Sequence, residues 1–254
     1  MIAGIKHINN GRAAAAQRVA LFDMLRGLSV LSMVGFHFCY DLVELRGINL
    51  AWFQPPFEDV WRASISWVFL ALAGVMCSFS SNNLKRAAKY GVVALAIWAA
   101  TTIAAVDVPI SFGIIYCMAA STFIFALLQR RKLQPSGVVF ALLCFTCFLA
   151  SLNISRGYLQ IPGFHLVLPG NLYASEWLSW LGFPGPKFSS GDYYPLLPYC
   201  LMYMTGASLG PWLKSNIPGS LSRLRAQPIE FVGRHALEIY ILHQPILLLL
   251  ANLF

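Results

Sequence analysis

Four ionisable side chains lie along one apolar stretch near the start of the chain. Asp23 and Arg26 are three residues apart, and His37 and Asp41, four apart, follow after ten mostly apolar residues. On insertion scales, an ionisable side chain at the centre of a membrane-spanning helix costs roughly 2.5 kcal/mol or more, so such residues usually mark a functional site. These four residues are therefore the first candidates for chemistry.

His37 and Asp41 carry the first candidate chemistry. Residues four apart on a helix face the same side. A carboxylate beside an imidazole fixes its tautomer and raises its basicity, which is how a general base is held by its orienting group. We therefore predict that His37 and Asp41 are catalytic. The same spacing also suits a histidine–aspartate hydrogen bond that only joins two helices.

Asp23 and Arg26 form the second candidate pair. The planar guanidinium of arginine matches the geometry of a phosphate group. Gly27, which follows Arg26, lets another backbone or a ligand come close because it has no side chain. We predict that Arg26 and Asp23 bind a phosphate-bearing cofactor, while the plainer interpretation is an ion pair at a helix end.

The composition is that of an integral membrane protein. Of the 254 residues, 58% are hydrophobic and 11% charged, whereas soluble domains carry about 25% charged residues. A membrane-spanning helix needs about 20 mostly apolar residues. We predict an all-α fold, a polytopic transmembrane helix bundle of about seven (7–8) spanning helices forming a single domain over 19–254. The predicted helices are 20–44, 63–83, 87–106, 110–129, 135–152, 194–213 and 231–253.

The Lys and Arg residues predict an orientation. Positive residues collect in the cytoplasmic connections of membrane proteins. Of the 18 Lys and Arg, those in the alternate connections are only Arg46, Arg62, Arg156 and Lys187. We therefore predict a multi-pass protein of the plasma (inner) membrane, with residues 1–18 as a cytoplasmic N-terminal segment. At 1.5 Å per residue, His37 then lies ~25 Å along the first helix, toward the outer side.

Charge and cysteine content exclude two other classes of site. The net charge is +8, but the basic residues form short clusters between apolar stretches, so we expect no nucleic-acid partner. The six cysteines all lie in apolar stretches, where they behave as small hydrophobic residues. Cys144 and Cys147 have metal-ligand spacing but lack a second ligand pair, and no metal site is predicted.

The connection at about 153–193 is too long for an ordinary loop and too apolar for disorder. Prolines interrupt it repeatedly. We predict an ordered outer-face lid or re-entrant segment with a short helix at 172–181. An aromatic belt at the membrane interface is an equally compatible interpretation. Asp192 and Tyr193, at its end, are predicted on the substrate side, where Asp192 can cap the helix that begins near residue 194.

The chain resembles a family of membrane acyltransferases. Arg26, ten residues and then His37 is similar to the Arg-x10-His signature of acyltransferase-3 proteins. The stretch from Arg26 to Leu42 resembles more closely the small bacterial proteins grouped with the catalytic domain of heparan-α-glucosaminide N-acetyltransferase. The resemblance runs from about 18 to 253, and further motifs that support it are Trp61-Arg62, Phe69–Gly74, Phe112–Ile115, Asp192–Pro198, Gly233–Tyr240 and Leu242–Pro245.

The resemblance implies that an acyl group, most simply acetyl, passes from cytoplasmic acyl-CoA to an amine or hydroxyl of a glycan or lipid-linked acceptor outside. His37 would then remove the acceptor's proton, or carry the acyl group covalently. Residues 43–62 hold no histidine, so the loop histidine proposed as catalytic in the eukaryotic enzyme has no counterpart here. Because the chain is short for this superfamily, the donor site is expected either to be abridged or to be completed by a second copy of the chain in a homo-oligomer.

Three more residues are assigned by position. Arg234 opens the last predicted helix on the cytoplasmic side and is predicted to bind CoA phosphates, unless it is only a positive anchor. His243, near the middle of that helix, is predicted to line the acyl tunnel or to bond a neighbouring helix. Arg62, on the outer side, is predicted to face substrate and to pair with Asp41, Glu58 or Asp59.

One other class of function remains open at this point. A small transporter or channel with a His/Asp proton relay would also need ionisable groups within membrane helices. Such proteins usually contain inverted repeats or paired broken helices, and we find neither in this sequence.

Overall fold

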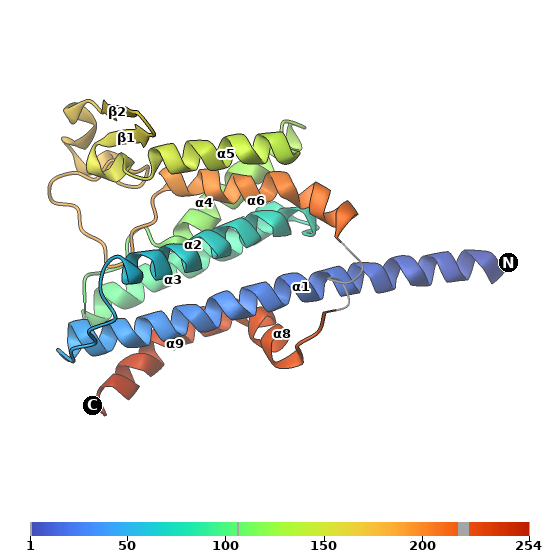
Figure 1. Cartoon of the computed structure of the whole chain (residues 1–254), viewed down its shortest axis with the longest axis horizontal. Helices are drawn as coiled ribbons and strands as arrows, with labels where there is room; N and C mark the ends of the chain where they lie inside the picture. The colour runs from blue at the N-terminus through green and yellow to red at the C-terminus, as the bar shows by residue number, and fades with distance from the viewer. Residues whose placement is uncertain (1, 106, 218–223, 254) are drawn as a thin grey trace. The chain divides into compact units, whose positions relative to one another are not determined.

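The computed structural model describes the backbone of residues 2–105, 107–217 and 224–253, and the side chains from Ala20 onward (Figure 1). Over these ranges the chain is mostly helical and contains one two-stranded sheet. It divides into two compact units. Unit 1 is Met1–Phe69 with Lys214–Phe254, and unit 2 is Leu70–Leu213.

Unit 1 brings the two ends of the chain together. Its helices are α1 (Ile2–Tyr40), the first part of α2 (Phe57–Val75), α8 (Gln227–Arg234) and α9 (Ala236–Ala251). At its end α1 widens into the π-helical turn η1 (Asp41–Leu45). Both α8 and α9 pack against α1, as Figure 1 shows.

Two glycines set the contact between α1 and α8. A Cβ atom on Gly27 would overlap the carbonyl oxygen of Ile229, and one on Gly233 would overlap that of Asp23. Residues without a side chain are therefore needed where the two backbones meet, as in close helix packing elsewhere in membranes. The close approach predicted for Gly27 is confirmed, and the approaching backbone belongs to α8.

Unit 2 begins at Leu70 within α2. Its other helices are α3 (Asn83–Ala104), α4 (Ile114–Arg130), α5 (Val138–Ser151) and α6 (Leu196–Asn216) as far as Leu213, with a 3-10 turn η2 (Met76–Ser78) after α2. Gly74 and Gly206 lie where α2 and α6 cross. A Cβ atom on either glycine would overlap a backbone oxygen of the facing helix.

The seven predicted apolar stretches all contain helix, but the last one is not continuous. It is divided at His235, which has non-helical φ and ψ angles of −101° and 22°. The His235 ring nitrogen Nδ1 lies 2.9 Å from the carbonyl oxygen of Phe231. The Phe231 carbonyl also accepts the last backbone bond of α8, from the His235 N–H at 3.2 Å, and α9 begins at Ala236. The single helix predicted at 231–253 is therefore wrong.

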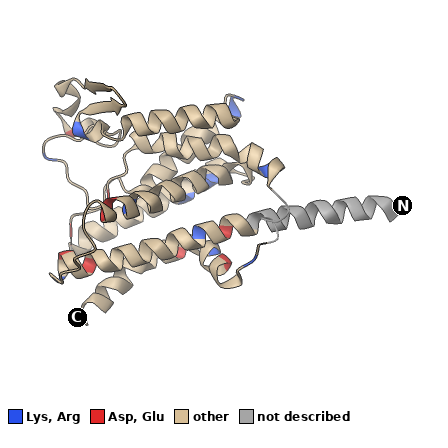
Figure 2. Ribbon diagram, in the orientation of Figure 1, with Lys and Arg blue, Asp and Glu red and all other residues tan. Residues whose placement is uncertain are grey.

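The predicted number of seven spans is not confirmed. Within the described residues, four helical stretches are long and apolar enough to cross a membrane, and they are Ala20–Leu45, Phe57–Ser78, Asn83–Ala104 and Val138–Arg156. The apolar helices α4 and α9 are shorter, and α6 contains glycine, proline, serine and threonine among its apolar residues. The Lys and Arg residues of α3 lie in its first two turns, and the rest of this helix carries no charged residue (Figure 2).

The connection between α5 and α6 contains a β-hairpin that the sequence analysis missed. Strand β1 (Tyr158–Ile161) pairs antiparallel with β2 (Phe164–Val167). Pro162 and Gly163 form the turn, in which Gly163 has a φ of 78°, as a proline–glycine type II turn requires. The helix predicted at 172–181 is wrong, because Gly170–Tyr173 and Glu176–Leu178 form separate 3-10 turns.

Candidate active site

His37 and His243 lie side by side in unit 1. Their ring centroids are 5.0 Å apart and the ring planes meet at 59°. His37 comes from the last turn of α1 and is partly exposed, whereas the His243 side chain on α9 is buried. The structure thus places His243, predicted as a cofactor residue, beside the predicted base.

The tautomer of His243 follows from its neighbours. Its Nδ1 atom lies 2.7 Å from the carbonyl oxygen of Tyr240, and a carbonyl oxygen only accepts hydrogen bonds, so Nδ1 carries the proton. In the neutral ring Nε2 then holds a lone pair. This Nε2 atom is buried and has no hydrogen-bond partner in the described part of the chain. His243 therefore presents an acceptor inside unit 1.

Asp41 is fully buried and is bonded from α9 by Gln244. The Gln244 amide nitrogen donates to both carboxylate oxygens, at 2.9 and 3.1 Å. The Oε1 atom of the same amide is buried and has no partner among the described residues. The widened turn η1 begins at Asp41, and such turns often occur at functional sites.

Sequence reasoning did not select Gln244 as a site residue. The available signal was its position, because it is a polar residue next to His243 in an otherwise apolar helix. Next to the Asp41 carboxylate, the buried Gln244 Oε1 offers a hydrogen-bond acceptor. Such an acceptor suits a ligand that donates, such as an amine or a hydroxyl.

Aromatic side chains surround Phe36, which precedes His37. Phe53 and Trp61 pack against it, with ring centroids at 5.3 and 5.5 Å. The Trp61 indole N–H donates to Ser32 Oγ at 2.8 Å and fixes the ring to α1. Trp52 and Phe57 complete this cluster and are about half exposed. Their open faces can stack against a flat apolar surface of a ligand.

Arg62, predicted on the substrate side, is bonded to Asp59. Its Nη2 atom donates to Asp59 Oδ1 at 2.7 Å, and both side chains are more than half exposed. Of the three predicted partners, the structure selects Asp59. An exposed ion pair contributes about 0–1 kcal/mol, so this pair leaves Arg62 available to a ligand.

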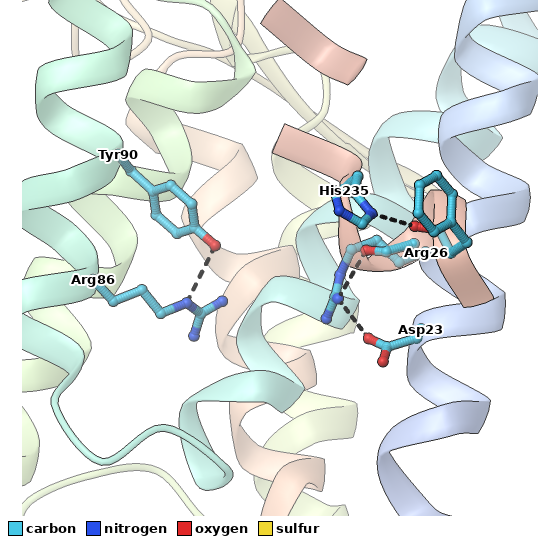
Figure 3. Close-up of polar contacts among 7 residues, drawn as sticks. Asp23, Arg26, Arg86, Tyr90 and His235 are labelled. Carbon is cyan, nitrogen blue, oxygen red and sulfur yellow. Dashed lines mark hydrogen bonds and ion pairs between the residues drawn. The ribbon is translucent and has the colours of Figure 1, made fainter. Parts of the chain in front are cut away.

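At the other end of the apolar part of α1, Arg26 joins α1 to α8 (Figure 3). Its Nη1 atom donates to Asp23 Oδ1 at 2.8 Å and to the carbonyl oxygen of Gly233 at 3.2 Å. The other guanidinium nitrogens make no hydrogen bond within the described residues. The predicted ion pair is therefore present, and Arg26 keeps donors that can bind an anion.

Arg234 lies close to this pair. It is exposed at the end of α8, and its charge acts favourably on the Asp23 carboxylate. Glu230 is buried in the same helix and accepts hydrogen bonds from the Arg225 guanidinium and the Ala226 N–H at the start of α8. Arg234 thus lies within electrostatic reach of the Asp23–Arg26 pair, and the cofactor-binding role of these three residues stays a prediction.

In unit 2, Asp192 and Tyr193 have structural partners. Asp192 Oδ2 accepts from the Ile114 N–H at 3.2 Å, so it bonds the first turn of α4. The Tyr193 hydroxyl donates to the Ser179 carbonyl at 2.6 Å. Burial raises the pKa of Tyr193 above its usual range, and the phenol therefore stays a neutral donor. Their substrate-side roles stay predictions.

A buried hydrogen-bond chain connects four helices of unit 2. Arg86, taken from the sequence only as a positive loop residue, donates to the Tyr90 hydroxyl (Figure 3). It also donates to the Ala73 carbonyl at 2.8 Å and to Cys77 Sγ. The Tyr203 hydroxyl lies 2.9 Å from Cys77 Sγ and 2.7 Å from Thr122 Oγ1. Thr122 donates to its own helix, so Tyr203 donates to Thr122.

Removing the hydroxyl of Tyr203 tests this chain. Tyr203→Phe leaves Thr122 and Cys77 without their shared partner in a fully buried place. We expect the free energy of unfolding to fall by about 1–3 kcal/mol, the cost of leaving buried polar groups unsatisfied. Thermal unfolding in detergent measures it. Tyr158→Phe on the hairpin is the matched control, and equal effects of both substitutions would contradict the assignment.

The described residues thus define a helical membrane protein with polar side chains near both ends of the apolar part of α1. Within the described part of the chain, no group of three or more His, Cys, Asp or Glu side chains is placed to hold a metal ion. The chain belongs to the heparan-alpha-glucosaminide N-acetyltransferase catalytic family, whose model matches residues 18–245. No curated protein and no solved structure matches it. The resemblance seen in the sequence is confirmed, and the family is one of membrane acetyltransferases.

Proposed function

We propose that the protein transfers an acyl group, most simply acetyl, from cytoplasmic acyl-CoA to an amine or hydroxyl of a glycan or lipid-linked acceptor on the outer side. The observation that carries this proposal is the separation of two polar groups along α1. One group is Arg26 with Asp23, and the other is His37 with Asp41. Arg26 and His37 are eleven residues apart, which is about 17 Å of helix.

The polar group formed by Asp23 and Arg26 suits the phosphates of CoA. Arg26 has guanidinium donors that are not used within the described residues, and Arg234 adds a second positive charge near Asp23. Two arginines can bind phosphate oxygens, while the long pantetheine arm carries the thioester away from them along α1. Asp23 holds Arg26 in place through its hydrogen bond.

The polar group formed by His37 and Asp41 suits the acyl acceptor. His37 removes the proton of the amine or hydroxyl as that atom attacks the thioester carbon. The new bond to carbon forms, the carbon–sulfur bond breaks, and CoA leaves as a thiolate that later takes up the proton. The Gln244 amide oxygen accepts hydrogen bonds and suits the N–H or O–H group of the acyl acceptor. The exposed rings of Trp52 and Phe57 suit a sugar ring.

The membrane orientation is part of this proposal. The distribution of Lys and Arg supports a multi-pass plasma (inner) membrane protein with a cytoplasmic N-terminus. In that orientation Arg26 faces the CoA pool and His37 the outer side. A second copy of the chain is a further proposed partner, beside membrane lipids. The transporter alternative has no support from the family match.

The test is a transfer assay with purified protein and labelled acetyl-CoA. The protein is incubated with amine- and hydroxyl-bearing glycans and with lipid-linked sugars, and labelled products are separated. Transfer of label, or acetyl-CoA hydrolysis without acceptor, supports an acyltransferase. Solute transport in vesicles that needs no CoA, together with no turnover of acetyl-CoA, contradicts it.

Arg26→Ala is expected to weaken donor binding. Loss of a charge-assisted contact to phosphate raises the KM for acetyl-CoA about tenfold or more, since such bonds contribute about 1.5–3 kcal/mol. The KM for the acceptor is expected to stay unchanged. Arg131→Ala, an exposed residue after α4, removes the same charge and is the control. Equal changes in both variants would reduce the role of Arg26 to general charge attraction.

A further inference from the structure

The ring neighbour of the proposed base is a second histidine. Asp41, expected from the sequence to orient His37, is bonded by Gln244. The ring that lies beside His37 across the α1–α9 contact is His243, with centroids 5.0 Å apart. In the structure the two rings are in contact without a hydrogen bond between them, and at this separation two ring nitrogens come within about 2.7–3.2 Å once they point at each other.

His243 is prepared to accept a hydrogen bond. The Tyr240 carbonyl holds the proton of His243 on Nδ1, and the lone pair therefore lies on Nε2. This atom is buried and lacks a partner in the described residues, although buried polar atoms are nearly always bonded. The partly exposed neighbour with an N–H group to offer is His37.

We propose that His243 is the positioning residue of the proposed reaction: it accepts the N–H of His37 and thereby turns the other ring nitrogen of His37 toward the acceptor. The inference rests on the proposed acyl transfer. In this order of hydrogen bonds, the amine or hydroxyl of the acyl acceptor donates to His37. His37 donates to His243 Nε2, and His243 Nδ1 donates to the Tyr240 carbonyl. His243 Nε2 here takes the place that the carboxylate has in a Ser-His-Asp triad, and the Tyr240 carbonyl fixes the tautomer of His243.

The proton movements balance along this chain. When the acceptor attacks the thioester carbon, its proton passes to the free nitrogen of His37. The positive charge that develops is shared with His243 through the hydrogen bond between the rings. No proton leaves the pair until the CoA thiolate takes it, which restores neutral His37 and releases CoA as the thiol.

Two substitutions separate positioning from packing. In His243→Leu the lone pair is lost, and in His243→Gln an amide oxygen replaces it at nearly the same distance from the backbone. We expect kcat to fall about 100-fold in His243→Leu, the lower end of what general-base catalysis contributes, with the KM for acetyl-CoA unchanged. His243→Gln is expected to recover kcat to within about tenfold of the native protein.

Nitrogen NMR of the protein labelled with 15N-histidine reads the tautomers without any activity. The native protein is expected to show His243 protonated at Nδ1 only and His37 in a single neutral tautomer. In His243→Leu the His37 signals should become those of a mixture of tautomers. His165→Leu, on the exposed strand β2, is the matched control in both measurements and should change neither.

The outcomes distinguish this inference from the proposed function. Normal kcat in His243→Leu, or an Nε2-protonated His243 in the native protein, overturns the role of His243 while acyl transfer stands. Expected tautomers in a protein that transfers no acyl group overturn the function while the hydrogen-bond order stands. If His243→Leu does not fold, the native spectrum and the kcat of His243→Gln decide.

Discussion

Replacing His37 with alanine is expected to lower acyl transfer by roughly 100- to 10,000-fold, the contribution of a positioned general base. The imidazole lies at the end of α1 with His243 beside it, and alanine offers no group that can take the acceptor's proton. Initial rates with labelled acetyl-CoA and the best acceptor measure the effect. Because His37 is partly exposed, the variant is expected to express and fold.

The controls for His37 also separate the two chemical mechanisms. His165→Ala changes an exposed histidine and should keep the native rate. If His37 carried the acyl group covalently, labelled acyl-protein would accumulate in the native protein without acceptor and be absent from His37→Ala. Direct transfer leaves no such species. Undiminished transfer by His37→Ala would remove His37 from the role of base.

The second large effect is expected from Gly233→Ala. A Cβ atom there would overlap the carbonyl oxygen and carbon of Asp23 and lie 3.0 Å from the Gly27 nitrogen. All three are backbone atoms, so they cannot rotate away and α8 has to separate from α1. Forcing atoms into a packed contact costs about 1–3 kcal/mol, occasionally more. We expect a clearly lower melting temperature in detergent.

The same substitution is expected to weaken donor binding. The Gly233 carbonyl holds Arg26 Nη1 at 3.2 Å, and a shifted α8 moves that carbonyl. The KM for acetyl-CoA should therefore rise in Gly233→Ala. Gly91→Ala in α3, where an added Cβ meets nothing within 4 Å, is the matched control. A native melting temperature in Gly233→Ala would show that the two backbones are not in close contact.

The sequence predicted the helices better than their ends. Each of the seven apolar stretches near 20 residues contains helix in the described part of the chain, because hydrophobicity along the chain is a local property. The break at His235 was missed, because one residue with non-helical angles in an otherwise helical stretch does not change the hydrophobicity of that stretch. The hairpin around Pro162 and Gly163 was also missed, because the apolar residues of the connection were interpreted as a lid or interfacial belt.

The candidate site was predicted in part. The ion pair of Asp23 and Arg26 was expected and is present. The bond from the α4 N-terminus to Asp192 was not predicted, because a capping carboxylate can bond an N-terminus that is near in space and distant in the sequence. Arg86 was interpreted as a loop charge, although its guanidinium bonds the end of α2. In each case the residue type was informative and the partner was not.

By itself the sequence determined that this is a helical membrane protein of one acetyltransferase family, with Arg26 and His37 eleven residues apart on one helix. Only the tertiary structure decided which groups they meet. Arg26 bonds Gly233, 207 residues away, and Asp41 bonds Gln244, 203 residues away. The physical reason is that periodicity fixes the face of one helix, whereas partners depend on how two helices rotate and cross. That crossing placed His243 beside His37.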